Sequence, residues 1–315
     1  MENRAVSRKP ARLIIREAAT RIRRDKFLWL LALPGIIYFA VFAYVPMSGL
    51  VISFMNYSPT RGIRGSQLVG FKYFIEFFSS PFFPRLLRNT VLLSLYGLLW
   101  GFPIPIIFAL LLNEVKNGLF KRTVQTVSYM PYFISVVVLA GMVQSFLTPY
   151  DGAVNKIIAA LGYETVNFMV QPRWFRTIYI ASGIWQGFGY ESIVYLAAIS
   201  AVDTQMYEAA RIDGATRMQI ILRITLPGIA PTAIILLIMN FGRIMNIGFE
   251  KVNLLYSPAV YETADVIATY VYRRGILDGQ FSFATAVGLF NSAVNLILIL
   301  TVNWISKRVT EVSLW

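Results

Sequence analysis

Carboxylates, lysines and tyrosines are the side chains that could do chemistry in this sequence, since it has 0 histidines and 0 cysteines. That composition excludes the usual zinc and copper ligands, the Ser-His-Asp triad, the Cys-His dyad and thiol redox chemistry. The nearest paired carboxylates, Glu262 and Asp265, have no supporting acid or metal cluster in their loop. No G-x-x-x-x-G-K-[ST] phosphate loop is present either. We therefore expect no catalytic residue, no metal site and no cofactor in this chain.

Two long apolar stretches each contain a single charge: Glu191 in residues 177–202 and Arg243 in residues 224–249. An ionisable group at membrane depth is costly and normally faces a cavity, so polar residues around these charges are candidates for lining a solute path. The predicted pathway residues are Trp185, Gln186, Tyr190, Glu191, Asn240, Arg243 and Asn246. Asn240, Arg243 and Asn246 are spaced to share one helix face. An internal Glu191–Arg243 ion pair that only holds the helices together is the alternative.

The apolar stretches predict an all-α integral membrane protein. Hydrophobic residues make up 57% of the 315 residues and charged residues only 14%, against ~25% charged in soluble proteins. Uncharged runs long enough to cross a bilayer occur at 27–60, 89–113, 123–150 and 279–306. With the two singly charged stretches, these give six transmembrane helices within residues 27–310.

The distribution of basic residues predicts how these helices are oriented. The net charge is +13, and nine basic residues lie in the tail 1–26. With both termini inside, the inner segments hold 17 Lys and Arg over 75 residues and the outer segments 11 over 96. This satisfies the positive-inside rule, so the tails 1–26 and 311–315 are expected in the cytoplasm. Because topology accounts for the basicity, no nucleic-acid partner is expected.

The predicted cytoplasmic loop 200–228 is typical of a helix, a turn and a second helix. Asp203 or Thr204 can cap the first helix, and Gly214 can adopt the left-handed conformation that ends it. Thr216 can start the second helix, and Pro227 is expected to stop it. We interpret this loop as a docking element, although a plain connector is the alternative.

The same loop carries a signature: Glu208-Ala209-Ala210, Asp213-Gly214-Ala215, then Ile224, Leu226, Pro227 and Pro231. In these residues and their spacing the chain resembles the EAA motif of permease subunits of bacterial ATP-binding-cassette (ABC) importers. The resemblance implies the type I ABC importer permease fold and a cytoplasmic coupling segment at 203–227. The coupling residues it implies are Glu208, Ala209, Ala210, Asp213, Gly214, Leu226 and Pro227.

The resemblance also implies a mechanism and a set of partners. The chain would be a translocation subunit in the bacterial cytoplasmic membrane and not an enzyme. It would work by alternating access with a second, homologous permease, and two copies of a cytoplasmic ATPase would bind the ATP and magnesium. An extracytoplasmic solute-binding protein would deliver the cargo. In this family the coupling segment fits into a groove of the ATPase.

Further phrases resemble the carbohydrate branch, the maltose-type first permease, and more closely the permeases for complex oligosaccharides or polysaccharide fragments. They are Trp185-Gln186-Gly187-Phe188-Gly189-Tyr190, Gly248-Phe249-Glu250, Leu254-Leu255-Tyr256, Ala264-Asp265-Val266-Ile267 and Phe283-Ala284-Thr285-Ala286-Val287-Gly288. Sugar contacts in maltose-type permeases fall near Gln186, Tyr190, Asn240 and Arg243. The chain lacks the maltose permease's extra N-terminal spans and its large outer insert, which leaves maltose in doubt as the cargo.

Two other functions would fit a polytopic chain. A membrane-embedded glycosyl-transfer enzyme would need the paired carboxylates that are missing. An importer permease for a non-sugar solute, such as amino acids or phosphate, is the stronger alternative. An anion importer should place unpaired Lys or Arg in its cavity, whereas the candidates here are mostly amides and aromatics with one Glu and one Arg.

Overall fold

The computed structural model describes residues 24–116, 118–310 and 312–314. These residues are mostly helical, as the sequence predicts, with one pair of two-residue antiparallel strands, β1 (Met55–Asn56) and β2 (Gln67–Leu68). The predicted basic tail 1–26 lies almost entirely outside the described residues. Contacts divide the chain into two units that meet after Ile52.

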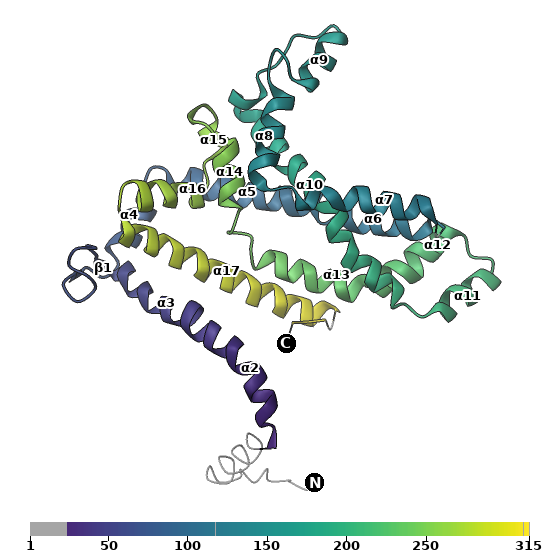
Figure 1. Cartoon of the computed structure of the whole chain (residues 1–315), viewed down its shortest axis with the longest axis horizontal. Coiled ribbons are helices and arrows are strands. Elements are labelled where there is room, and N and C mark those ends of the chain that lie inside the picture. Colours follow the sequence, from purple (N-terminus) through teal and green to yellow (C-terminus); the bar gives the residue numbers. More distant parts are fainter. Residues whose placement is uncertain (1–23, 117, 311, 315) are drawn as a thin grey trace. The chain divides into compact units, whose positions relative to one another are not determined.

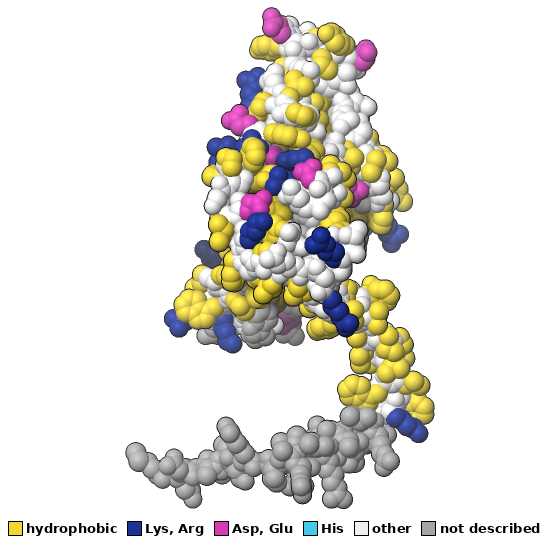
Figure 2. Space-filling view, turned by 90° about the vertical axis from the view of Figure 1, so that its left-hand side faces the viewer, with side chains coloured by type: hydrophobic (Ala, Val, Ile, Leu, Met, Phe, Trp, Pro, Cys, Tyr) yellow, Lys and Arg dark blue, Asp and Glu magenta, His cyan; other side chains and the backbone are white. Residues whose placement is uncertain are grey.

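The first unit is an apolar helix. It comprises α2 (Lys26–Phe39), a wide π-helical turn (Ala40–Tyr44) and α3 (Val45–Met47), followed by a 3₁₀ stretch (Ser48–Phe54) that runs into the second unit. None of the residues from Lys26 to Met47 is buried. A helix that is hydrophobic all round and not covered by protein is typical of a membrane span. Figure 2 shows hydrophobic side chains over most of this helix.

The second unit holds the remaining helices (Figure 1). They are α4 (Lys72–Phe78), α5 (Phe83–Gly101), α6 (Pro103–Glu114), α7 (Leu119–Tyr129), α8 (Val136–Leu147), α9 (Ala153–Ala160), α10 (Pro172–Ser200), α11 (Thr204–Ile212), α12 (Arg217–Ile220), α13 (Leu226–Phe241), α14 (Phe249–Leu255), α15 (Tyr261–Ala264), α16 (Ile267–Tyr272) and α17 (Phe281–Thr310). The long helix α10 packs against α5, α6, α7 and α13, and α13 lies beside α17. Helix α10 is therefore central to the packing of this unit.

Buried apolar side chains form three clusters in the second unit. One includes Leu93, Phe175 and Val252 and joins α5 and α10 to α14. A second includes Phe77 and Phe283 and joins α4 to α17, and a third around Ile229 joins α6, α10 and α13. Many large apolar side chains elsewhere stay exposed, as expected of a surface that faces lipid.

Four helices in the described residues are long and apolar enough to cross a membrane: Lys26–Phe54, Phe83–Glu114, Arg217–Phe241 and Phe281–Thr310. A bent pair, Leu119–Phe133 and Val136–Leu147, would make a fifth if it is one span. Helix α10, the predicted fourth span, has 29 residues but is not among them. Its polar residues, including Glu191, lower its hydropathy. The fold thus supports several spans, and the full count of six stays a prediction.

The predicted third span is broken. Its two helices meet at an angle of 100° around Ile134, whose backbone is extended, and the Ser135 hydroxyl accepts a hydrogen bond from Val138 N that caps α8. Residues 123–150 are one uncharged run, from which the sequence predicts a continuous helix. Hydropathy alone does not reveal a break whose backbone groups are satisfied by side chains.

The expectation that Pro227 stops the second helix of the loop is wrong. Helix α12 continues through a π-helical turn (Ile221–Thr225) into α13, and Pro227 lies in the first turn of α13. Proline lacks an N–H group, and the widened turn directly before it accommodates that loss. Pro46 likewise follows a π-helical turn, in the first unit.

The predicted fifth span ends earlier than expected. Helix α13 stops at Phe241, so Arg243 and Asn246 do not share a helix face with Asn240, and that prediction is wrong. Residues 242–248 instead form turns and an irregular segment. Gly242 approaches α17 closely, because a Cβ built on it would stand 2.7 Å from Ile299 Cδ1. Close packing and an intrinsically poor helix former coincide where the helix ends.

Candidate functional site: a polar cavity beside α10

A cavity of about 720 Å³ lies in the second unit, lined by residues of α5, α10, α13 and α14. Its volume is in the range of about 300–1,000 Å³ found for small-molecule sites. Of the predicted pathway residues, all but Trp185 line it: Gln186, Tyr190, Glu191, Asn240, Arg243 and Asn246. Trp185 is 43% exposed and lies outside the lining. The structure therefore brings together residues from two stretches that the sequence separates.

The irregular segment after α13 borders this cavity, and side chains from other helices satisfy part of its backbone. Ser94 on α5 donates to the Ile244 carbonyl, and Met245 N donates to Asn295 Oδ1 on α17 at 3.1 Å. Non-helical backbone at membrane depth is tolerated only where protein buries it or where it lines a water-filled cavity. The segment is partly buried by protein and borders the cavity, so Arg243 and Asn246 reach the cavity without a helix.

The amides of the cavity are partly engaged in the fold. Gln186 Nε2 donates to the Ile134 carbonyl at 2.8 Å, which satisfies the backbone at the break between α7 and α8. Asn240 Nδ2 donates to the Leu236 carbonyl of its own helix at 2.9 Å. In each case the amide oxygen remains on the side chain as an acceptor for a hydroxyl group.

Two tyrosines form a flat aromatic surface in the lining. The rings of Tyr132 and Tyr190 stack with centroids 3.8 Å apart and planes at 6°. Tyr132, in the turn after α7, was not among the predicted residues. Tyr132 covers one face of the Tyr190 ring, and the Phe133 ring also meets Tyr190 in a T-shaped contact at 6.2 Å, so a ligand that packs on Tyr190 has only the opposite face available.

Glu191 and Arg243 both reach the cavity, but no ion pair joins them in the described part of the chain. The Glu191 carboxyl lies over Gly187, where a Cβ would stand 2.9 Å from Oε1. The Arg243 guanidinium makes no hydrogen bond or ion pair with any described residue. The described residues therefore do not form the ion pair on which the alternative depends, and a role for the two charges in the solute path stays a prediction.

Lys251, on α14, is the cavity residue that sequence reasoning missed. Its side chain is only 9% exposed, its Nζ donates to the Tyr179 carbonyl at 2.7 Å, and the ammonium stands 4.6 Å from the centroid of the Tyr179 ring. Burial lowers the pKa of Lys251 to about 8. The available signal was its position two residues after a singly charged apolar stretch, yet charge counting assigned it to an outer loop.

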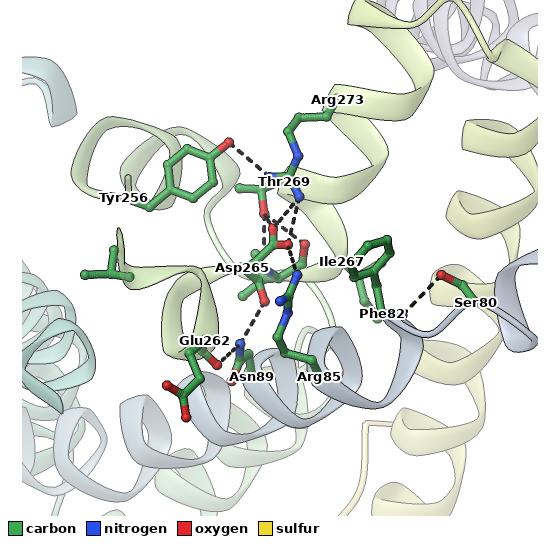
Figure 3. Close-up of polar contacts among 12 residues, drawn as sticks. Ser80, Phe82, Arg85, Asn89, Tyr256, Glu262, Asp265, Ile267, Thr269 and Arg273 are labelled. Atoms are coloured by element: carbon green, nitrogen blue, oxygen red, sulfur yellow. Dashed lines mark hydrogen bonds and ion pairs between the residues drawn. The ribbon is translucent and has the colours of Figure 1, made fainter. Parts of the chain in front are cut away.

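A second polar cluster holds the segment that follows α14 (Figure 3). The fully buried Asp265 accepts two hydrogen bonds from Arg273 Nη2, each 2.8 Å, and one from Arg85 Nη2 at 3.2 Å. The Thr269 hydroxyl adds a fourth at 2.9 Å. We call Asp265, Arg85, Arg273 and Thr269 the Asp265 network. Burial opposes the charge on Arg273, but its hydrogen bonds to Asp265 and Tyr256 outweigh this and raise the pKa of Arg273.

Asn89 ties the same segment to two long helices. Its Nδ2 donates to the carbonyls of Glu262 and Asp265, at 2.9 and 3.0 Å, and its Oδ1 accepts from Arg176 Nη2 at 3.0 Å. The polar contacts of Figure 3 thus fix α15 and α16 onto α5, and the Arg176 bond joins α5 to α10. Of Glu262 and Asp265, the nearest paired carboxylates in the sequence, Asp265 takes part in structural contacts through its side chain and Glu262 through its backbone carbonyl.

The predicted coupling segment has the expected local structure. Asp203 caps α11 by accepting a hydrogen bond from Gln205 N at 2.9 Å, and Gly214 has φ +75° in the turn. Thr216 and Gln219 form a capping box that starts α12. Glu208 is exposed, and so are the apolar side chains of Met206 (51%), Ile212 (86%) and Met218 (63%).

One contact links this segment to the base of α13. The Tyr207 hydroxyl on α11 donates to Thr225 Oγ1, in the π-helical turn before α13, at 3.2 Å. Helix α12 runs without a break into α13, whose last residues lie at the cavity. A displacement of α11 would therefore act on a helix that reaches the cavity.

Comparison with known proteins assigns the chain to a family. Residues 101–311 match the model of the binding-protein-dependent transport system inner membrane component. The chain belongs to this family. It is the membrane component of such a transport system and not its enzyme. Both the coupling segment and the cavity-lining residues on α10 and α13 fall inside the matched range.

Relatives of this permease cover nearly the whole chain. The polygalacturonan/rhamnogalacturonan transport system permease protein YteP of Bacillus subtilis is 46% identical over 92% of this chain and 91% of its own. A permease chain of a bacterial ABC transporter involved in the import of the acidic polysaccharide alginate has a TM-score of 0.86 and 46% identity, covering 93% of this chain and 99% of its own. The alginate transporter in complex with an alginate pentasaccharide-bound periplasmic protein matches with the same TM-score and identity over 94% and 99%.

Proposed function

We propose that the chain is one permease of an ATP-driven, binding-protein-dependent importer of complex oligosaccharides or polysaccharide fragments. The observation that carries this proposal is the cavity beside α10, where amide oxygens, aromatic rings and charged groups meet at the irregular end of α13. Sugar hydroxyls hydrogen-bond to amide and guanidinium groups, and an aromatic ring packs on the apolar face of a pyranose. The named relatives, which transport polysaccharides, support the same cargo class.

The cargo passes by alternating access between this permease and a second, homologous one. A partner permease completes the passage. An extracytoplasmic binding protein delivers the cargo, and two copies of a cytoplasmic ATPase bind ATP and magnesium. The complex of the alginate transporter with a loaded periplasmic protein supports this assembly.

In the membrane the chain spans six times with both termini in the cytoplasm. Helix α10 counts as the fourth span, because its 29 residues are long enough to cross and its polar residues turn toward the cavity. The bent pair around Ile134 counts as the third span. The higher density of Lys and Arg in the inner segments supports this orientation.

The coupling segment 203–227 docks on the ATPase. Glu208→Lys places the wrong charge on its exposed surface, and Gly214→Val strains the left-handed turn by roughly 1–3 kcal/mol. Both changes should abolish ATP hydrolysis stimulated by the binding protein while the permease still inserts and binds its partner permease. Normal stimulation in both variants would remove this role from the segment.

Uptake into vesicles that contain the complete transporter tests the proposed function. A panel of labelled single substrates should include oligosaccharides, amino acids and phosphate. We expect uptake of oligosaccharides that requires both ATP and the loaded binding protein. Uptake of an amino acid or of phosphate, without any oligosaccharide, would make this a permease for a non-sugar solute.

A further inference from the structure

The cavity lining contains two positively charged side chains that form no ion pair within the described part of the protein. Lys251 and Arg243 both line it, and Glu191 is the one carboxylate among the described lining residues. Neither cation forms an ion pair with Glu191 or with any other described carboxylate. If all three groups are ionised, the lining has a net positive charge.

The groups around Lys251 contact its ammonium, but none of the described ones is a carboxylate that would neutralise its charge. Of its three N–H groups, one donates to the Tyr179 carbonyl, and the other two have no partner in the described part of the chain. The Tyr179 ring packs against it as a cation–π contact. A Cβ on residue 183 would stand 3.0 Å from Lys251 Nζ. Gly183 therefore leaves space on α10 for the ammonium group.

Arg243 adds a second cation from a different element. It follows the end of α13, on the irregular segment that Ser94 and Asn295 hold in place, and its guanidinium has no protein partner in the described residues. A guanidinium donates two parallel N–H groups to a carboxylate, and an ammonium acts as a point charge. Both are suited to a mobile anionic group that arrives with the cargo.

An unpartnered cation in such a place is costly. Buried charges in proteins are normally paired, so this cost applies to Lys251, which is 9% exposed, and not to Arg243, which is exposed. Ionisable groups inside a membrane protein that lack a partner mark substrate paths. The arginines of the Asp265 network are an example of the normal case in the same molecule. A ligand that supplies the missing anion would explain why Lys251 and Arg243 are left without one.

We propose that Lys251 and Arg243 bind carboxylate groups of the cargo as it passes, so that this permease selects oligosaccharides of uronic acids over neutral ones. The inference rests on the proposed function and adds the charge of the substrate to it. The amide oxygens of Gln186 and Asn240 and the free face of Tyr190 contact the hydroxyl groups and rings of the same sugar units. Arg243 and Lys251 distinguish charged from neutral sugar units by binding the carboxylates.

The test compares two saccharides of the same chain length, one with free carboxylates and one with these groups methylated. Vesicles with the complete transporter and its binding protein take up a uronic-acid oligosaccharide or its methyl ester, which has the same length and no charge. A third arm offers an organic phosphate. The readout is the ratio of acid to ester uptake, because a general loss of folded or active protein cancels in that ratio.

The variants separate charge from shape. Lys251→Met keeps the length of the side chain without its charge and should lower the ratio about tenfold or more, as expected when a charge-assisted hydrogen bond is lost. Gly183→Ala leaves the charge in place but displaces the ammonium, and should lower the ratio less. Lys156→Met, which changes an exposed lysine on α9 outside the cavity, is the matched control and should leave the ratio unchanged.

Each outcome of this experiment either supports or overturns the inference. A ratio that is the same in wild type and Lys251→Met, with both saccharides transported, overturns the inference and leaves the proposed function intact. Uptake of neither saccharide by the wild type overturns both. Uptake of the organic phosphate alone, lost in Lys251→Met, would make the bound anion a phosphate and also overturns the uronic-acid cargo.

Discussion

Asp265 and Lys251 are both almost completely buried in the second unit, with 0% and 9% of the side chain exposed. Asp265 meets two arginines and a threonine, so four hydrogen bonds satisfy its carboxylate. Lys251 meets one carbonyl and one aromatic ring, and no carboxylate. A buried charge with protein partners holds the structure together, whereas one without them is available to a ligand. The predictions below test this distinction.

The largest effect is expected at the Asp265 network. Asp265→Asn leaves Arg85 and Arg273 without their anion and should lower the free energy of unfolding by about 3–5 kcal/mol, the usual result of removing one partner from a buried ion pair. Thermal unfolding of the purified permease measures it. All cargoes should lose uptake equally, because the segment that carries α14 to α16 loosens as a whole.

The exposed pair of Arg274 and Glu76, with 33% and 41% of their side chains accessible, is the control for this prediction. Glu76→Gln should change stability by about 1 kcal/mol or less. If Asp265→Asn is no more damaging than Glu76→Gln, the network is not what holds the segment.

The second prediction is a gain in stability, opposite to the loss expected for Asp265→Asn. Lys251→Met removes a buried, unpartnered charge and should raise the free energy of unfolding at pH 7 by about 1–3 kcal/mol. The pKa of Lys251 is lowered from 10.5 to about 8, so the unfolded chain binds more protons between these values. Wild-type stability should therefore rise as the pH increases from about 8 to about 10, and the advantage of Lys251→Met should shrink over that window. Unfolding measured across this pH range would contradict the account if Lys251→Met were less stable than wild type throughout.

The smallest effects are expected from the neutral cavity residues. Asn240→Ala and Tyr190→Ala remove a hydrogen-bond acceptor and a packing surface without stranding a charge. Each should reduce oligosaccharide uptake by several-fold at matched protein levels, since a neutral hydrogen bond contributes about 0.5–1.5 kcal/mol. Acid and ester should be affected alike, which distinguishes these residues from Lys251. Unchanged uptake in both variants would move the sugar path to the partner permease.

Single charges in apolar runs proved to be a useful signal in the sequence. They singled out Glu191 and Arg243, and the polar neighbours chosen with them, apart from Trp185, line one cavity. Local capping rules also predicted Asp203, Gly214 and Thr216 correctly, because those contacts join residues close in the chain.

Contacts between distant residues could not be predicted in the same way. Helix α13 ends at Phe241 because Ser94 and Asn295, from two other helices, take over backbone groups beyond it. Lys251 is buried because Tyr179 and Gly183, about seventy residues away in sequence, receive its ammonium. Nor did the sequence reveal the π-helical turn that lets the helix continue through Pro227. Hydropathy and periodicity carry no information on such partners.

Chemical protection of a single cysteine tests the central claim most directly, since the chain has 0 native cysteines. In a transporter with cysteine-free partner subunits, Asn246→Cys places a thiol in the cavity lining and Trp185→Cys places one outside it. With ATP present, binding protein loaded with a uronic-acid oligosaccharide should slow labelling at 246, relative to empty binding protein, and leave 185 unchanged. Equal labelling at 246 with loaded and empty binding protein would contradict the claim that the cargo occupies this cavity.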